Sequence, residues 1–503
     1  MRILGCWKNP YRTDRKGEFV VYRKLLSVIV LILIAASAAS ASPDSSFTVP
    51  DTPTGECVKA YFSAFAAGED AMREFSLKCV AEEALNQRPM DERLQMYTRM
   101  KQQIGEIQPV RLLTSDSASM EVLVKSAADQ WYSFSFMFEP IPPHKLIGIR
   151  IEMADSTMAN ELTTPMSQQE FTDSLKNRLR MMANEDEFSG VVLVARDGII
   201  IFEQAYGMAD KSFSAPNRLD TKFNLGSINK FFTKIAIGQL VQEGKLHFDD
   251  TLGSFLPEYP NADARSKVTV RQLLNMTSGI GDFFGKKFDM TPKTMFRSND
   301  DFLPMFDSLP LTFPPGTQQQ YSNGGYVVLG AIVEKVSGMP YYDYVRQHIY
   351  SPCGMRNTDW YAADSPVENL AQGYTHPNDS SNEYTSNIYT RPARGSAAGG
   401  GYSTAEDLLK FTIALDNNQL LWDEYTNWVF GGPEPSPTAS SQDLESEPPR
   451  SMGIAGGAPG INADIEADFD AGWTVIVLGN YDPPNASRVA RFVARWADRI
   501  MDN

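Results

Sequence analysis

The sequence predicts an α/β protein of the α+β type, in which a small α+β domain precedes a larger domain built on one sheet. Three observations predict it. Residues 110–154 alternate apolar and polar residues as four strands do, after two or three helical segments. In the 171–503 region, strand segments lie near both ends, at 188–210 and 461–482. Helices and loops fill about 227–420, so the larger sheet takes its strands from both ends around a helical insert.

The elements of the first domain follow from its periodicity. Residues 55–84 space their apolar residues as helices do, with a break at Gly68, and residues 91–105 form another helix that ends at glycine. The strands that follow are VRLLTS, MEVLVKSA, WYSFSFMFEP and KLIGIRIEMA. Together these segments make a domain over residues 55–152, for which we expect a spacer or docking role.

The larger domain begins with a helix at 171–185. Residues 188–210 then form two apolar strands around Asp197-Gly198, a dipeptide typical of tight hairpins. A helix at 485–501 follows the last strands and closes the chain. The strands at the two ends of this region are therefore expected to share one sheet.

The first 41 residues have the order of an export signal. Arg23 and Lys24 precede the apolar run LLSVIVLILIAA, and the small residues SAASA end at Ala41. The apolar run is short for a membrane span, which favours a cleaved signal over a retained anchor. We expect an exported protein, periplasmic or extracellular, that is cleaved near Ala41 and keeps no stable membrane span.

The remaining boundaries follow from composition. Residues 42–54 and 153–170 are polar and are interpreted as linkers, so residues 171–503 form the larger domain. The segment 433–449 is rich in Ser, Pro and Glu. It is either a lid over the functional site or a surface excursion.

Charge excludes one class of partner. The 503 residues carry a formal charge of −16, and 42% of them are hydrophobic, as in a globular protein. Nucleic-acid binding requires a basic face. We therefore expect no nucleic-acid partner, and the candidate site residues described below predict a small-molecule or peptide acyl substrate.

The positions of the cysteines and histidines do not indicate a metal-binding site. Cys57 and Cys79 flank one helical stretch, so they either pair in an oxidising compartment or remain two buried thiols. The four histidines are scattered along the chain without a pair at ligand spacing. We expect no metal site and no cofactor.

Ser227 and Lys230 form the strongest candidate for chemistry. They occur in FNLGSINKFF, where an amphipathic helix begins, and this is the sole S-x-x-K match in the chain. A spacing of three places both side chains on one helix face. Desolvation lowers the pKa of a lysine, so that it accepts a proton from a nearby serine. The alternative is a structural serine beside a solvated amine.

Tyr321 and Asn323 are the partner candidates. Tyr-x-Asn occurs at three positions, but only YSN at 321–323 follows a Pro-Pro-Gly turn and precedes an amphipathic helix. A loop held by a rigid turn can direct a phenol and an amide into a cleft. We expect Tyr321 to move a proton between Ser227 and the leaving group, and Asn323 to bind substrate.

No nucleophile-elbow serine competes with this set. Ser403 is the nearest approach, in GYSTA, but Glu406 follows it by three residues. That spacing predicts a capping box in which Ser403 begins a helix. Ser403 is therefore interpreted as structural.

Five ordered segments resemble the serine β-lactamase-related family, the branch with class C β-lactamases, D-alanyl-D-alanine carboxypeptidases and related serine esterases. They are FNLGSINKFF (223–232), VTVRQLLNMTSGIGDFF (268–284), FPPGTQQQYSNGGYVVLGAIVEKVSG (313–338), AAGGGYSTAEDLLKF (397–411) and GGAPGINA (456–463). The resemblance covers about residues 171–503. It implies an antiparallel sheet flanked by helices, a helical subdomain, the site between them, and Ser227 as nucleophile.

The chain departs from the family at the third motif. Relatives carry Lys-Thr-Gly or His-x-Gly on the strand beside the site, whereas Ile454-Ala455-Gly456 stands here. Glycine lets backbone lie close to a substrate, so Gly456 and the N–H of Gly457 remain candidates for substrate binding and for an oxyanion hole. The cationic or imidazole side chain of the motif is lost.

These observations predict an exported serine hydrolase that forms an acyl-enzyme on Ser227. An esterase or a D-amino-acid peptidase is expected first, and β-lactam hydrolysis only as a weak activity. The alternative is a binding protein that keeps the fold without catalysis, because the third motif is incomplete.

Overall fold

The structure is a computed structural model that describes residues 47–115, 119–139, 143–154, 165–376, 383–435, 450–497 and 499–500. The expected signal peptide, most of the second linker and nearly all of the expected lid lie outside these residues. The chain divides into two compact units, one ending at Ala154 and the other beginning at Asp155. Each unit has its own hydrophobic core.

The first unit packs helices on one antiparallel sheet. The helices are α1 (Pro53–Ala67), α2 (Glu69–Cys79), α3 (Glu82–Gln87) and α4 (Met90–Ile104). The strands are β1 (Ile107–Ser115), β2 (Ser119–Ser126), β3 (Trp131–Phe138) and β4 (Leu146–Ala154), hydrogen-bonded in that order. Tyr61 contacts Phe134 and Phe136 of β3 edge-on or tilted, so α1 is fixed to the sheet by aromatic packing. The four-strand meander that the alternation predicts is confirmed.

Cys57 and Cys79 do not form a disulfide in this structure. Both are buried free thiols, on α1 and α2 respectively. The hydrogen bond between them raises the pKa of Cys57 and lowers that of Cys79. Of the two alternatives that the sequence left open, the structure contains the reduced pair.

The second unit is built on a five-stranded antiparallel sheet in the order β13-β14-β15-β5-β6. Its strands are β5 (Gly190–Arg196), β6 (Ile199–Tyr206), β13 (Ser451–Ala458), β14 (Ile461–Asp468) and β15 (Trp473–Gly479). Strands from both ends of the unit thus share one sheet, as predicted. The β5–β6 turn has positive φ at both Asp197 and Gly198, which is the tight hairpin geometry that this dipeptide favours.

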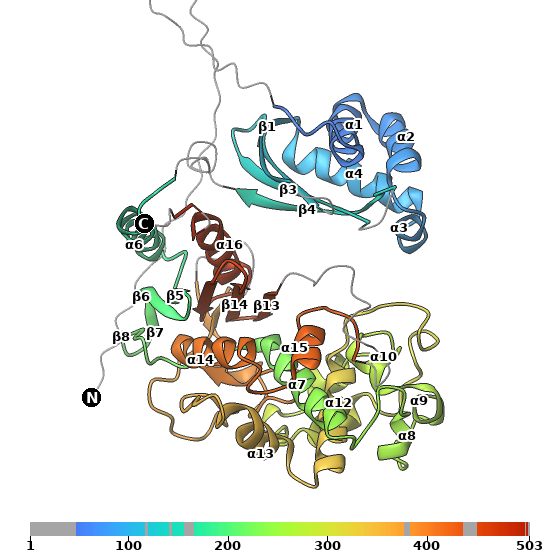
Figure 1. Cartoon of the computed structure of the whole chain (residues 1–503), viewed down its shortest axis with the longest axis vertical. Helices are drawn as coiled ribbons and strands as arrows, with labels where there is room; N and C mark the ends of the chain where they lie inside the picture. The colour runs from blue at the N-terminus through green and yellow to red at the C-terminus, as the bar shows by residue number, and fades with distance from the viewer. Residues whose placement is uncertain are drawn as a thin grey trace, which may run out of the picture. The chain divides into compact units, whose positions relative to one another are not determined.

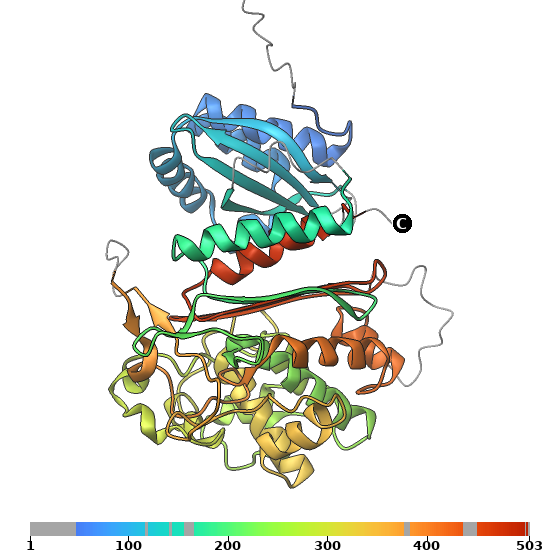
Figure 2. The same cartoon turned by 90° about the vertical axis from the view of Figure 1, so that its left-hand side faces the viewer.

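Helices cover both faces of this sheet (Figures 1 and 2). On one face, α6 (Gln168–Asn184) and α16 (Asn485–Ala497) pack on Val192 and Val194 of β5. On the other, the helical part packs on Val191 and Leu193. This alternation follows from the two-residue period of a strand.

The helical part contains the longer helices α7 (Asn229–Gln242), α12 (Asn323–Ser337) and α14 (Ala405–Asp416). Shorter elements connect them: α8 (Leu252–Phe255), α9 (Ala262–Lys267), α10 (Val270–Leu274), α11 (Lys286–Met290), α13 (Tyr341–Val345), α15 (Asp423–Val429), and the short strands β7 (Met208–Asp210), β8 (Ala215–Pro216), β9 (Phe223–Asn224), β10 (Tyr374–Thr375), β11 (Thr385–Ser386) and β12 (Tyr402–Ser403). Within the described residues, no helix combines the length and apolarity needed to cross a bilayer.

The expected capping role of Ser403 is wrong. Thr404 is the N-cap of α14, and its side chain accepts from the backbone N–H of Asp407. Ser403 instead lies in β12, where its buried hydroxyl lies 2.7 Å from that of Thr358. The cap is one residue further along because the backbone of Ser403 pairs with Phe223 of β9.

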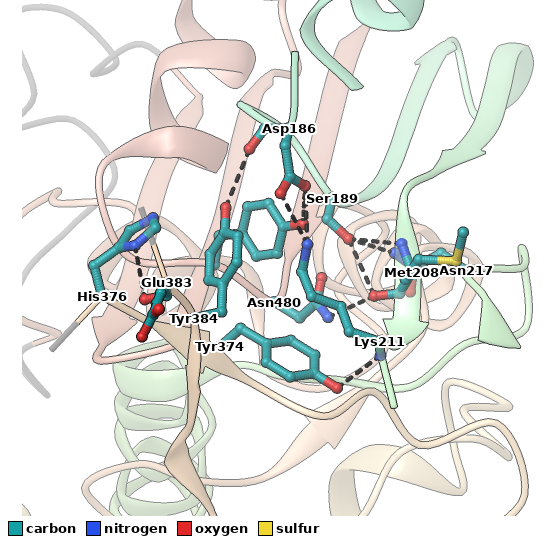
Figure 3. Close-up of polar contacts among 11 residues, drawn as sticks. Asp186, Ser189, Met208, Lys211, Asn217, Tyr374, His376, Glu383, Tyr384 and Asn480 are labelled. Carbon is teal, nitrogen blue, oxygen red and sulfur yellow. Dashed lines mark hydrogen bonds and ion pairs between the residues drawn. The ribbon is translucent and has the colours of Figure 1, made fainter. Parts of the chain in front are cut away.

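A polar cluster fixes the β10–β11 hairpin to the end of the sheet (Figure 3). The Lys211 amine bonds both carboxylate oxygens of Asp186, at 3.0 and 2.9 Å, and lies over the rings of Tyr384 and Tyr481. The Tyr374 phenol accepts from the Lys211 backbone N–H at 2.7 Å. Lys211 and Asp186 are paired with each other within the cluster, so we assign it a structural role.

Candidate active site

Ser227 lies in a single 3₁₀ turn, η1 (Gly226–Ile228), that leads directly into α7. Gly226 has φ +51, in the left-handed region, and a Cβ there would lie 2.8 Å from the backbone N of Gly457. Glycine is therefore required for the serine turn to approach β13. The helix beginning expected around Ser227 is confirmed, with a 3₁₀ turn in place of a full α-helical turn.

The structure brings Ser227, Lys230, Tyr321 and Asn323 together. The Ser227 Oγ lies 2.6 Å from the Tyr321 Oη and 3.1 Å from the Lys230 Nζ. The Lys230 amine also donates to the Asn323 Oδ1 at 2.7 Å and to the Ala398 carbonyl at 2.6 Å. Asn323 is the first residue of α12 and Tyr321 lies just before its N-cap, about ninety residues beyond the serine turn.

These contacts prepare the Lys230 amine to accept a proton. A neutral amine has two N–H donors and one lone pair, and the carbonyl oxygens of Asn323 and Ala398 take both donors. The lone pair is then left for the Ser227 hydroxyl. When the amine is protonated, the same three contacts satisfy all three of its N–H groups.

Burial lowers the pKa of Lys230 to about 7, and the charge of Asp282 opposes part of this change. Burial also raises the pKa of Tyr321, although its hydrogen bond with Ser227 acts in the other direction. Near neutral pH the lysine is thus often neutral and the tyrosine keeps its proton. These states suit the lysine as a base and the tyrosine as a donor.

Asp282 is a site residue that sequence reasoning missed. Its Oδ2 accepts from the Asn323 Nδ2 at 2.6 Å, which holds the amide oxygen of Asn323 toward Lys230. Its position in SGIGDFF, one of the segments that resemble the family, was the available signal. Chain order alone gave no reason to connect it with Asn323.

Gly456 and Gly457 lie on β13, which is an edge strand of the sheet. A Cβ at Gly456 would lie 1.9 Å from the Leu225 carbonyl oxygen and 2.8 Å from the Ser227 N. β13 therefore packs directly against the serine turn, and backbone rather than side chains forms this wall. Ile454 lies on the same strand. It occupies the position at which the resemblance would place the lysine or histidine of the third motif.

A cavity of about 1000 Å³ opens in front of Ser227. Its walls include phenylalanine side chains of residues 283–302, the segment 389–402 and residues 455–462 of β13 and β14. Among the described residues, no three His, Cys, Asp or Glu side chains gather as a metal site would need. The cavity is large enough for a small acyl compound or a short peptide.

The sequence profile of the β-lactamase family matches residues 178–498. Penicillin-binding protein 4* of Bacillus subtilis is 32% identical over 40% of this chain and 45% of its own length. The putative penicillin-binding protein PbpX of the same organism is 30% identical over 58% of this chain and 70% of its own. Esterase EstB of Burkholderia gladioli is 35% identical over 35% and 47%. The chain thus spans less than half the length of two of these relatives.

Solved structures agree with the sequence comparison. A penicillin-binding protein from Bacillus halodurans matches with a TM-score of 0.54 and 30% identity, over 65% of this chain and 98% of that protein. A D-stereospecific amidohydrolase from Streptomyces sp. matches with a TM-score of 0.52 and 26% identity, over 64% and 97%. The expected fold, an antiparallel sheet flanked by helices with a helical subdomain, is confirmed.

Proposed function

Because the chain belongs to the β-lactamase family, we propose that it is a serine hydrolase in which Ser227 forms an acyl-enzyme. The observation that carries the proposal is the Lys230 amine, whose two donors are taken by carbonyl oxygens while its third contact is the Ser227 hydroxyl. Burial also lowers the pKa of Lys230 to about 7, which lets the amine act as a base near neutral pH.

The proposed steps use only groups of this chain and water. The Ser227 hydroxyl passes its proton to the Lys230 amine, and its oxygen bonds to the substrate carbonyl carbon. The N–H groups of Ser227 and Gly457 receive the oxyanion. Tyr321 then donates a proton to the leaving group as the ester or amide bond breaks, and the protonated lysine returns a proton to the tyrosine. Water releases the acyl group by the same steps in reverse.

The proposed substrates are small esters or amides, including D-amino-acid peptides. The similarity to an esterase and to a D-stereospecific amidohydrolase supports this class. β-Lactam hydrolysis is proposed only as a weak activity, because Ile454 supplies no cation on β13. Asn323 is proposed to bind substrate in addition to holding Lys230.

The test is intact-mass analysis of the protein after treatment with a fluorophosphonate. We expect one adduct on the wild type, and none on Ser227→Ala. Ser487→Ala, which removes another hydroxyl that lines the cavity, is the control and should still form the adduct. Equal labelling of wild type and Ser227→Ala would contradict Ser227 as nucleophile.

A binding protein without catalysis is the second candidate, and the absent third-motif cation favours it. It predicts no adduct on folded wild-type protein. If neither an activated ester nor a penicillin acylates the folded protein, the binding-protein proposal replaces the catalytic one.

We also propose that the protein is exported, periplasmic or extracellular, and that its signal peptide is cleaved near Ala41. The basic, apolar and small-residue order of the first 41 residues supports it. N-terminal sequencing of protein recovered outside the cytoplasm should begin close to Ser42. Recovery of uncleaved protein in the cytoplasm would contradict export.

A further inference from the structure

The cavity in front of Ser227 carries an excess of positive charge. Lys293, Arg391 and Arg394 line it, and Asp289 is the one carboxylate among the described residues of its lining. The whole chain, in contrast, has a formal charge of −16. A positive cleft raises the local concentration of anions, even in a protein whose net charge is negative.

Arg391 is held in position by a neutral group, and no charged partner for it occurs among the residues that the structure describes. Its Nη1 donates to the Tyr402 Oη at 2.6 Å. Tyr402 lies in β12 and pairs with Asn224 of β9. Asn224 comes three residues before Ser227 in the sequence. The anchor of the guanidinium is thus part of the strand pair that carries the serine turn. A guanidinium has five N–H donors, and the contact to Tyr402 uses one of them.

Arg394 is held in a similar way. Its Nε donates to the Trp360 carbonyl at 2.8 Å, and its guanidinium lies 3.8 Å from the ring centre of Tyr342. In the described part of the chain, neither Arg391 nor Arg394 has a carboxylate within ion-pair distance. By comparison, Arg297 and Arg346 of the same unit pair with Asp364 and Asp359.

We propose that Arg391, with Arg394 nearby in the same wall, binds an anionic group of the substrate, most simply a carboxylate. The inference rests on the proposed function and narrows its substrate class. Ile454 leaves β13 without the cation of the third motif, and the 390–396 segment supplies positive charge from a different wall of the cavity. Arginine suits this role because its planar fork binds carboxylate in a bidentate manner.

The test compares matched chromogenic esters. Mono-4-nitrophenyl succinate and its methyl ester differ by a carboxylate in the acyl part. 3-Carboxy-4-nitrophenyl butyrate and 4-nitrophenyl butyrate differ by one in the leaving group. In at least one pair, we expect the ratio of kcat/KM, anionic over neutral, to fall by about 10–100-fold from wild type to Arg391→Met, since charged hydrogen bonds are lost.

Two variants serve as controls. Arg391→Lys keeps the charge and should restore part of the ratio. Arg297→Met removes a paired cation that does not line the cavity, and should leave the ratio at its wild-type value. A ratio that Arg391→Met does not change in either pair would overturn the proposal.

A binding measurement separates this inference from the catalytic proposal. In Ser227→Ala, calorimetric titration should show tighter binding of one anionic ester than of its neutral match, and Arg391→Met in the same background should abolish the difference. If no ester is turned over, this binding difference still supports the anion site. Equal binding of both members of each pair would overturn the anion site even if Ser227 is acylated.

Discussion

The Lys230 amine has to be neutral for the proposed first step, so activity should depend on its titration. Burial lowers its pKa to about 7, and kcat/KM for an activated ester should therefore rise with pH and level off above about 7. Below that pH the rate should fall about tenfold per unit, because the fraction of neutral base falls by that factor. The measurement is a kcat/KM profile from pH 5 to 9, with folding checked at each pH.

Lys230→Ala should lose nearly all activity, and its remaining kcat/KM should not show the rise with pH below about 7, which is the acidic limb of the wild-type profile. A wild-type profile that is flat across pH 6 to 8, on protein shown to be folded, would contradict Lys230 as the base.

Asp282 should influence the pH at which the acidic limb of the kcat/KM profile levels off. Its charge raises the pKa of Lys230, so Asp282→Asn should move the acidic limb to lower pH. The variant should also lower kcat, because Asp282 orients the amide of Asn323. Asp289→Asn, which removes a carboxylate from the cavity lining, is the comparison for a general charge effect. A limb that moves to higher pH in Asp282→Asn would contradict this assignment.

Among the elements around the site, β13 tolerates side-chain substitution least, because it packs directly against the serine turn. A Cβ at Gly456 would lie 1.9 Å from the Leu225 carbonyl oxygen, so Gly456→Ala must push the strand away from the serine turn. We expect it to cost about 1–3 kcal/mol of unfolding free energy, as overpacking does. A shift of this wall should also lower kcat/KM by about 100-fold, because reacting groups lose their alignment.

Gly453→Ala on the same strand is the matched control. Its Cβ would meet only the end of the flexible Glu466 side chain, at 3.0 Å. It should remain near wild type in urea unfolding and in kcat/KM. Equal behaviour of the two variants would show that the close approach at Gly456 is not what constrains the strand.

The packing of α7 on the end of α15 should make stability depend on pH. The Lys234 amine donates to the Trp428 and Val429 carbonyls, and burial lowers its pKa to about 8. Between pH 8 and 10.5 the unfolded chain binds more protons at this lysine than the folded one, so the free energy of unfolding rises with pH there. The full rise from this group is about 3 kcal/mol.

Urea unfolding of wild type and Lys234→Met at pH 7, 8, 9 and 10 measures this contribution. The difference between the two proteins should move in favour of wild type as pH increases. A constant difference across this range would show that Lys234 does not titrate near 8 in the folded protein.

Local patterns predicted the elements that depend on local interactions. Asp197-Gly198 predicted the hairpin because both residues accept positive φ, and alternation predicted the strands because one face of each is buried. The cap of α14 was misplaced by one residue, because a strand pair with Phe223 decides where β12 ends. Sequence spacing carries no information on such a long-range pair.

The same distinction applies to the site. Ser227 and Lys230 were predictable from their spacing on one helix, and Tyr321 and Asn323 from a motif after a rigid turn. The contact of Lys230 with the Ala398 carbonyl joins residues 168 positions apart. Asp282 contacts Asn323, 41 positions further along the chain, and Arg391 lines the same cavity as Ser227 from a distant part of the sequence. Only the folded chain places these groups beside the serine.

At the level of the whole molecule, all the described residues of the site belong to the second unit. Residues from Asn224 to Ser487 line its cavity, all beyond the unit boundary at Asp155. The first unit forms its own core from α1–α4 and its four-stranded sheet. Neither the serine turn nor the β13 wall needs a residue from it, so the first unit is expected to add to location or binding and not to chemistry.

This separation predicts that residues 165–503 fold and act without the first unit. We expect kcat/KM on 4-nitrophenyl butyrate to stay within about threefold of the longer chain, because independent domains keep their cores when separated. The measurement compares residues 47–503 with residues 165–503, each with its Ser227→Ala variant as background. Thermal unfolding of residues 47–503 should show one transition for each unit. Residues 165–503 should lack the transition of the first unit and keep that of the second. A shorter form that is folded by circular dichroism but inactive would show that the first unit contributes to the site, and it would move the search for the missing group to α1–α4 and their sheet.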